Sequence, residues 1–293
     1  MTRCKNMISV PVLLVSLNTL LVLPGFSQSF EKMAHRGGSA LMPENTIIAM
    51  QNAMDFGVSL EMDLYLSKDK QVFVYHDDKI SPKFGSNPDG TPVTQEQAAK
   101  KKIIDFTYAE LKPYDMGMRA HPDFPRRKQV KAGIPLLTEL IDSVESYAKR
   151  GELKLPNYSM EIKVPNASLA PRYKADLVDR AIGIIRSKNI VERVIIQSFD
   201  LEALEYLHQQ YPDVKTAFLV GQGHYLDNLK KLSFTPTAYS PPYQLVTPEL
   251  IAYCHTNNML VVTWTVNNKK DIERLKQLGV DVVMSDYPDY FLP

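Results

Sequence analysis

The sequence predicts an α/β fold, a (β/α)8 TIM barrel with an inserted loop or small subdomain after the third strand. Three observations support this. Short apolar, β-branched segments alternate with amphipathic segments, which is the pattern of parallel βαβ units. The chain has 293 residues, close to the ~250 typical of one such barrel. No glycine-rich dinucleotide motif follows a predicted strand, which argues against a Rossmann sheet.

The first 27 residues are predicted to be a secretory signal peptide. Arg3 and Lys5 provide a positive start, residues 7–23 are almost wholly apolar, and small residues follow up to Ser27. An uncleaved membrane anchor is the alternative, but the apolar run is short for a span of ~20 residues. We therefore expect cleavage near Ser27, a secreted or periplasmic protein without a stable membrane span, and a single domain over residues 28–293.

Nine strands and six helices are predicted after the signal. The strands are expected at 32–35, 58–66, 72–76, 158–162, 194–197, 215–220, 237–240, 260–266 and 280–285. The helices are expected at 44–56, 138–149, 173–188, 201–210, 248–257 and 269–278. This many alternating units favours a closed barrel over an open sheet.

The second and third predicted strands cannot be parallel neighbours. Only residues 67–71 join them, whereas a parallel crossover needs about a dozen or more residues. An antiparallel hairpin with its turn near Lys68 and Asp69 would place Glu61 beside His76. Since nine strands exceed the eight of a barrel, one arm of the hairpin is expected to lie outside it.

The segment 78–135 interrupts the alternation of strands and helices. Gly85, Pro88, Gly90 and Pro92 break regular structure there, and a polar stretch follows at 95–102. A long insertion after a strand at the catalytic face often forms a lid or a small subdomain. We expect it to belong to the same domain as the barrel.

The charge of the chain gives no sign of a nucleic-acid partner. It has 34 basic and 33 acidic residues, and removing Arg3 and Lys5 with the signal leaves 32 basic against 33 acidic. This balance provides no broad basic surface. Cys254 is the one cysteine outside the signal, so it has no disulfide partner within the chain and is expected in the core rather than as a catalytic thiol.

Ionisable residues recur at the ends of predicted strands, where a barrel enzyme has its active site. Glu61 and Asp63 are two positions apart on one strand and face the same side, and Glu161 has a similar place on a later strand. Three converging carboxylates repel one another unless a cation neutralises them, and an all-oxygen set suits one divalent cation, Ca²⁺ or Mg²⁺. Alternatively, Glu61 or Glu161 forms a buried ion pair with Lys163 or Arg36.

Two histidines accompany these carboxylates. His35 and His76 can each donate or accept a proton near neutral pH, so they are candidates for the acid and the base of a reaction at phosphorus. Arg36 and Lys163 provide positive charge for a phosphate-sized anion. Trp264, the only tryptophan, either lines the pocket opposite the metal or belongs to the core.

These residues belong to a longer series of short motifs. The series is His35-Arg36-Gly37-Gly38, Pro43-Glu44-Asn45-Thr46, Glu61-Met62-Asp63, His76-Asp77, Phe106-Thr107-Tyr108-Ala109-Glu110-Leu111, Ile134-Pro135-Leu136-Leu137-Thr138-Glu139, Glu161-Ile162-Lys163, Gln197-Ser198-Phe199 and Trp264-Thr265-Val266-Asn267. Taken together and in this order, it resembles the glycerophosphodiester phosphodiesterase family. The resemblance covers nearly the whole chain after the signal, and it is specific although each motif alone is weak.

The resemblance implies a barrel enzyme that hydrolyses a small molecule, a glycerophosphodiester, to glycerol 3-phosphate and an alcohol. It also implies roles for individual residues: a metal on Glu61, Asp63 and Glu161, acid–base catalysis by His35 and His76, and phosphate binding by Arg36. Glu44 is expected behind the site, where it would orient Arg36 or a ligand.

The chain departs from the family pattern in two places. Residues 67–70 replace the usual Thr-x-Asp-Gly turn, and residues 117–131 have no recognisable counterpart, which leaves the alcohol group open. Two alternatives to the family reaction are a phospholipase D-like phosphodiesterase acting on lysolipids or sphingolipids, and a secreted non-catalytic ligand-binding barrel. The polar character of 117–131 argues against the first, and the intact metal and histidine positions argue against the second.

Overall fold

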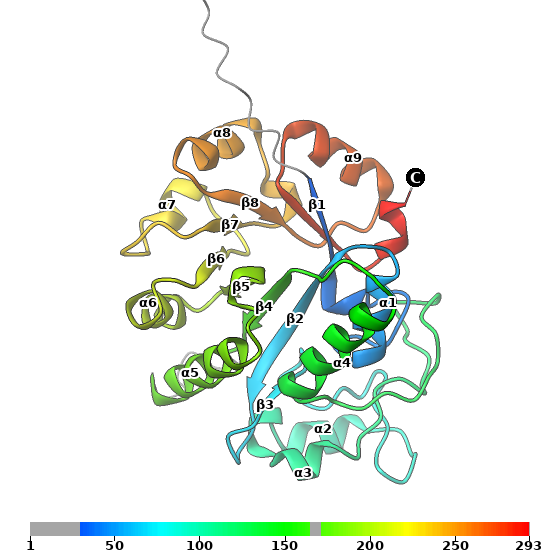
Figure 1. The fold of residues 1–293 in the computed structure, drawn as a ribbon. Coiled ribbons are helices and arrows are strands. Elements are labelled where there is room, and N and C mark those ends of the chain that lie inside the picture. The colour runs from blue at the N-terminus through cyan, green and yellow to red at the C-terminus, as the bar shows by residue number, and fades with distance from the viewer. Residues whose placement is uncertain (1–29, 165–170, 293) are drawn as a thin grey trace, which may run out of the picture.

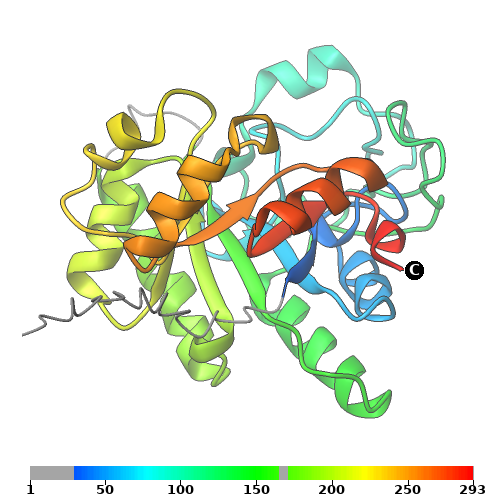
Figure 2. The same cartoon turned by 90° about the horizontal axis from the view of Figure 1, so that it is seen from above.

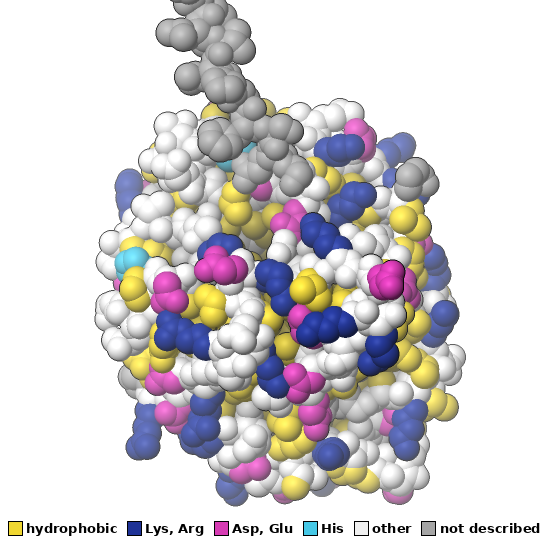
Figure 3. Space-filling view, viewed as in Figure 1, with side chains coloured by type: hydrophobic (Ala, Val, Ile, Leu, Met, Phe, Trp, Pro, Cys, Tyr) yellow, Lys and Arg dark blue, Asp and Glu magenta, His cyan; other side chains and the backbone are white. Residues whose placement is uncertain are grey.

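The computed structural model describes residues 30–164 and 171–292, which form a barrel of strands surrounded by helices (Figures 1 and 2). The predicted signal peptide lies outside these residues. Within them, no helix combines the length and the apolar character needed to cross a membrane. Figure 3 shows basic and acidic side chains interspersed over one face of the molecule.

All nine predicted strands are present and form one sheet. They are β1 (Glu31–Ala34), β2 (Ser59–Leu66), β3 (Val72–Val74), β4 (Tyr158–Ile162), β5 (Val194–Ser198), β6 (Lys215–Leu219), β7 (Ala238–Ser240), β8 (Leu260–Thr263) and β9 (Val282–Ser285). Eight of them form a closed parallel ring in the order β1-β9-β8-β7-β6-β5-β4-β2, which β1 closes by pairing with β2. The predicted (β/α)8 barrel is confirmed.

The six predicted helices are also present. They are α1 (Ile47–Met54), α4 (Leu137–Arg150), α5 (Pro171–Ser187), α6 (Leu201–Gln210), α8 (Pro248–Thr256) and α9 (Lys269–Leu278). Local capping explains where several begin, since the side chains of Asp200 and Asn268 accept hydrogen bonds from the first turns of α6 and α9. A short helix, α7 (Tyr225–Leu229), was not predicted, because five residues show little helical periodicity.

Helix α1 begins later than the predicted start at residue 44. Asn45 has a φ of 57°, in the left-handed region, which is incompatible with a continuous helix. Thr46 then acts as the N-cap, its side chain accepting a hydrogen bond from the backbone N–H of Ala49. Glu44 and Asn45 thus lie in a turn beside the barrel mouth rather than in a helix.

The register of the β2–β3 hairpin differs from the predicted one by one residue. β3 is antiparallel to β2 and pairs with no other described strand, so it is the arm outside the barrel; the pairs are Leu64–Val74, Tyr65–Phe73 and Leu66–Val72. The N–H of Ser67 donates to the carbonyl of Gln71 at 2.9 Å, which encloses a turn one residue longer than the prediction requires. Extending this register would place Met62 opposite His76, so the predicted pairing of Glu61 with His76 is wrong.

The insertion between β3 and α4 packs against this hairpin. It contains α2 (Gln95–Lys100) and α3 (Tyr108–Leu111), which were not predicted as helices and which begin with capping boxes at Thr94 and Thr107. The insertion and the hairpin share an apolar cluster of Tyr65, Phe73, Tyr75, Ile80, Phe84, Val93, Ala98, Ile103, Leu111, Met116 and Ile134. Phe73 lies on β3 and Tyr65 on β2, so the insertion folds against both arms of the hairpin, including the arm outside the barrel (Figure 1).

Asp115 holds the second half of the insertion together. Its buried carboxylate accepts hydrogen bonds from the backbone N–H groups of Gly117 (3.0 Å), Met118 (2.7 Å) and Ala132 (2.9 Å). A Cβ atom added at Gly117 would lie 2.0 Å from the carbonyl oxygen of Val130, so the two ends of this loop approach too closely for a side chain there. The loop therefore closes around a single carboxylate.

We expect Asp115→Ala to lower the free energy of unfolding by about 2–3 kcal/mol, because buried N–H groups would lose their acceptor. Urea unfolding followed by circular dichroism measures the change. Asp123→Ala, an exposed carboxylate in the same loop, is the matched control and should have little effect. Equal unfolding midpoints for the two variants would contradict the role assigned to Asp115.

Candidate active site

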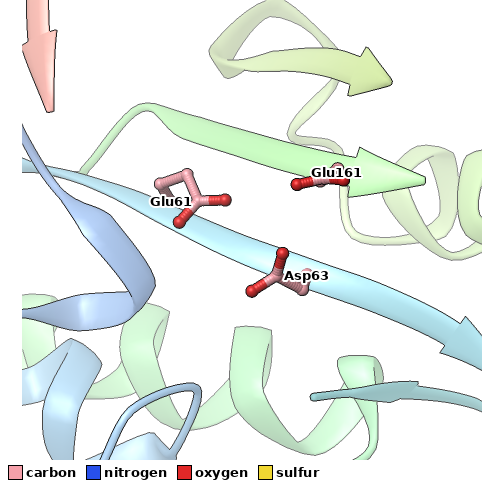
Figure 4. Close-up of side chains that lie close together, drawn as sticks. All are labelled: Glu61, Asp63 and Glu161. Atoms are coloured by element: carbon pink, nitrogen blue, oxygen red, sulfur yellow. The ribbon is translucent and has the colours of Figure 1, made fainter. Parts of the chain in front are cut away.

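Three carboxylates from two neighbouring strands meet at the mouth of the barrel (Figure 4). Glu61 and Asp63 lie on β2 and Glu161 on β4, with Asp63 and Glu161 directly paired in the sheet. One oxygen of each lies within 4.8 Å of the others, and all three side chains are buried. The structure thus brings together the three residues that were predicted to bind a metal.

The pKa values of this cluster reflect both burial and mutual repulsion. Burial raises the pKa of Glu61 well above its usual range, and the charge of Asp63 raises it further. Burial also raises the pKa of Glu161, to about 7, although Lys163 opposes this shift. Burial acts in the same direction on Asp63, but Lys163 and other nearby positive charges hold the pKa of Asp63 below its usual range. A further cation would make the fully ionised set less costly.

Arg36 and Lys163 neutralise part of the negative charge. Nη1 of Arg36 lies 3.0 Å from Glu44 and its Nε 3.6 Å from Asp63. Nζ of Lys163 lies 3.0 Å from Glu161 and 3.6 Å from Asp63. Ion pairs of the kind offered as an alternative to a metal are therefore present. Two cations nevertheless face four carboxylates, the three above and Glu44. With all four carboxylates ionised, two negative charges are left over, which a hard divalent cation would neutralise.

Amide groups orient two of the three carboxylates, Glu61 and Asp63. The side chain of Gln197 on β5 donates to Glu61 at 3.1 Å, and that of Asn45 donates to Asp63 at 2.7 Å. The backbone N–H of Arg36 donates to the second oxygen of Glu61 at 2.8 Å. These contacts leave the carboxylates little rotational freedom, as a preformed site requires.

The backbone of the turn after β1 makes the Arg36 contact possible. Arg36 has a φ of 52°, in the left-handed region that non-glycine residues rarely adopt. Gly37 follows with a φ of 78°, and a Cβ atom there would lie 2.9 Å from Cβ of Ala49. The glycine therefore lets the turn approach α1 closely while the N–H of Arg36 reaches Glu61.

Each predicted catalytic histidine forms a hydrogen bond with a carboxylate through Nδ1. His35 is paired with Asp286 at 2.7 Å, and His76 with Asp77 at 2.8 Å. Burial raises the pKa of Asp286, but His35 and a hydrogen bond from Asn267 bring the pKa below its usual value. These contacts leave Nε2 of each ring as the nitrogen available to a substrate.

A model of the glycerophosphoryl diester phosphodiesterase family matches residues 35–290. The chain belongs to this family. Membership confirms the resemblance found in the motifs and, with it, the predicted class of enzyme, a phosphoric diester hydrolase of glycerophosphodiesters.

Individual members resemble the chain over most of its length. The glycerophosphodiester phosphodiesterase of Caldanaerobacter subterraneus is 29% identical, over 88% of this chain and 94% of its own. A putative family member from Silicibacter pomeroyi has a similar crystal structure, with a TM-score of 0.80, 26% identity and coverage of 91% and 92% of the two chains. The fold is shared with an Oleispira antarctica phosphodiesterase in complex with the product sn-glycerol-3-phosphate, with a TM-score of 0.67, 21% identity and coverage of 88% and 93%.

Trp264 lies beyond the end of β8 and is partly buried. Its indole N–H donates to the carbonyl of Ser240 at 3.0 Å. Its ring makes a T-shaped contact with Phe199, which follows β5 and is 46% exposed. Trp264 also packs on the apolar residues inside the barrel. It therefore combines the contacts of a core residue with partial exposure near the barrel mouth. Its contact with substrate stays a prediction.

The sequence analysis assigned no contact to five residues of this site. Asn45, Asp77, Gln197 and Asn267 were present in the quoted motifs, but nothing in the sequence indicated which groups their side chains would contact. Asp286 directly follows β9, and its position at the end of a strand was the available signal.

We expect Glu61→Gln, Asp63→Asn and Glu161→Gln each to weaken divalent-cation binding at least about tenfold, since second-shell changes alone typically cost that much. Calorimetric titration of chelated protein with Ca²⁺ and with Mg²⁺ measures the affinity. Asp142→Asn, on the exposed side of α4, is the control. Wild-type affinity in all three site variants would show that the cluster is not a metal site.

Proposed function

We propose that this chain hydrolyses glycerophosphodiesters to glycerol 3-phosphate and an alcohol, using one divalent cation, Ca²⁺ or Mg²⁺. The observation that carries the proposal is the assembly, in a member of this family, of two carboxylate-paired histidines around three buried carboxylates. The product named in the Oleispira antarctica complex supports the same product here.

The charged residues of the site would have different roles in binding the phosphodiester group. Arg36 and Lys163 would bind the phosphoryl oxygens through charge-assisted hydrogen bonds. A cation held by Glu61, Asp63 and Glu161 would neutralise charge on the same oxygens. Glu44, which accepts a hydrogen bond from Arg36, would keep the guanidinium turned toward the site.

The surroundings of the histidines suggest their separate roles. His76 borders a cavity of about 500 Å³ that could hold the departing alcohol, whereas His35 is absent from its lining. We therefore assign His76 as the acid that protonates the leaving oxygen and His35 as the base that activates the attacking oxygen. Asp286 would fix the orientation of His35 and stabilise its protonated form.

A lysolipid substrate has less support. The cavity beside His76 is lined by Asp77, Asp78 and Lys79, and an acyl chain would remove these groups from water without compensation.

His35→Ala and His76→Ala should each lower kcat on glycerophosphodiesters by about 10²–10⁴-fold, the usual loss when general acid–base catalysis is removed. A nitrophenyl phosphodiester, whose leaving group needs no proton, should be turned over far better by His76→Ala than by His35→Ala. His224→Ala, an exposed histidine, is the matched control. Near-wild-type turnover of glycerophosphodiesters by both folded site variants would contradict the two-histidine mechanism.

We also propose that the enzyme acts outside the cytoplasm, as a secreted or periplasmic protein. The basis is the positive start and apolar run of residues 1–27. Intact-mass measurement of protein exported by a bacterial host should show a first residue near Gln28. A product that keeps residues 7–23 would instead support a membrane anchor.

A further inference from the structure

A cavity of about 500 Å³ lies between the site and the insertion. One wall is formed by Tyr65, His76 and Lys163 from the barrel side, and another by Gln95, Ala98 and Ala99 around helix α2. The hydroxyl of Tyr65 donates to the backbone carbonyl of His76 at 3.1 Å, which holds the aromatic ring beside the histidine. The cavity therefore begins where the leaving oxygen would be protonated and ends at a part of the chain outside the barrel.

Four of the eleven lining residues carry a formal charge, and two of these four already have a hydrogen-bond or ion-pair partner. Asp77 is bonded to His76, and Lys163 is paired with Glu161 and Asp63. Asp78 and Lys79 also line the cavity, and neither forms an ion pair with another residue in the part of the chain that the structure describes. The cavity thus offers one negative and one positive group to whatever enters it.

We propose that this cavity binds the alcohol portion of the substrate and selects alcohols that carry both an ammonium and a carboxylate group. Asp78 would bind the ammonium and Lys79 the carboxylate. The inference rests on the proposed function and narrows its substrate to glycerophosphodiesters of a hydroxy amino acid. Glycerophosphoserine is the simplest of these. In the net reaction, water supplies the new oxygen on phosphorus, the bond to the serine oxygen breaks, and that oxygen leaves with a proton.

Physical chemistry favours a doubly charged group over the alternatives. A neutral alcohol such as glycerol would gain no charge-assisted contact from Asp78 or Lys79, and an amine without a carboxylate would gain one from Asp78 alone. An acyl chain would cover both charged groups and gain only the few apolar contacts of Pro82, Ala98, Ala99 and Val164.

The test compares kcat/KM for three diesters whose alcohols carry different charged groups: glycerophosphoserine, glycerophosphoethanolamine and glycerophosphoglycerol. The metal-loaded wild-type enzyme should prefer the serine diester. Asp78→Asn should lower kcat/KM for the serine and ethanolamine diesters about tenfold relative to the glycerol diester, the size expected when a hydrogen bond between charged groups is lost. Lys79→Gln should lower it about tenfold for the serine diester relative to both others.

Matched controls lie on the same insertion. Glu96 and Lys100 of α2 are exposed, pair with each other at 2.8 Å and do not line the cavity. Glu96→Gln and Lys100→Gln change the same charges as the two test variants, so they should leave the order of the three substrates unchanged. This separates a local contact from a general effect of net charge.

The outcomes are distinguishable. Hydrolysis of the diesters with parallel losses for all three in Asp78→Asn and Lys79→Gln would overturn the selectivity and leave the proposed function standing. A wild-type preference for the glycerol diester would do the same. No hydrolysis of any diester by metal-loaded enzyme would overturn the proposed function and this inference together.

Discussion

Negative charge concentrated inside the barrel mouth is the constraint on which the rest of the site depends. Glu61, Asp63 and Glu161 place oxygens within 4.8 Å of one another in a buried position, where ionised groups are costly unless they are paired. Neighbouring side-chain and backbone groups lower this cost by forming hydrogen bonds and ion pairs with the carboxylates. Arg36 contributes both its backbone N–H and its side chain, and Asn45 contributes its amide. Both of these residues have positive φ values, so unfavourable backbone conformations occur where groups must reach the carboxylates.

A carboxylate holds each of the two histidines through Nδ1, but the two carboxylates differ in burial. Asp286, the partner of His35, has a side chain only 8% exposed, whereas that of Asp77, the partner of His76, is 42% exposed. A buried carboxylate fixes the orientation of its histidine more strictly, since water cannot compete for the hydrogen bond. The more open pair borders the cavity where the alcohol is proposed to leave. This difference in burial accompanies the position of His76 beside the cavity, which is the basis for the roles proposed for the two histidines.

Local patterns explain how much of the fold and the site the sequence could predict. The strands and the longer helices repeat with regular periods, and Glu61 and Asp63 share a face simply because they are two residues apart on a strand. The contact between His35 and Asp286 spans 251 positions and exists only because β1 and β9 pair in the closed barrel. The hairpin register depended on one extra residue in a turn, which hydrophobic alternation does not specify. Helices α2 and α3 are too short for periodicity and depend on their caps and on packing against the hairpin.

Strand β2 connects the candidate active site to the insertion. Tyr65 belongs to the apolar cluster of the insertion, lines the cavity and donates a hydrogen bond to the backbone of His76. The three carboxylates lie on β2 and β4, and their hydrogen-bond donors lie on β5 and in the turns that precede α1. None of these segments belongs to the insertion. Changes in the insertion can therefore alter the cavity wall without disturbing the metal-site carboxylates. This separation is consistent with the proposal that the barrel carries the phosphodiester chemistry and that Asp78 and Lys79 select the alcohol that is released.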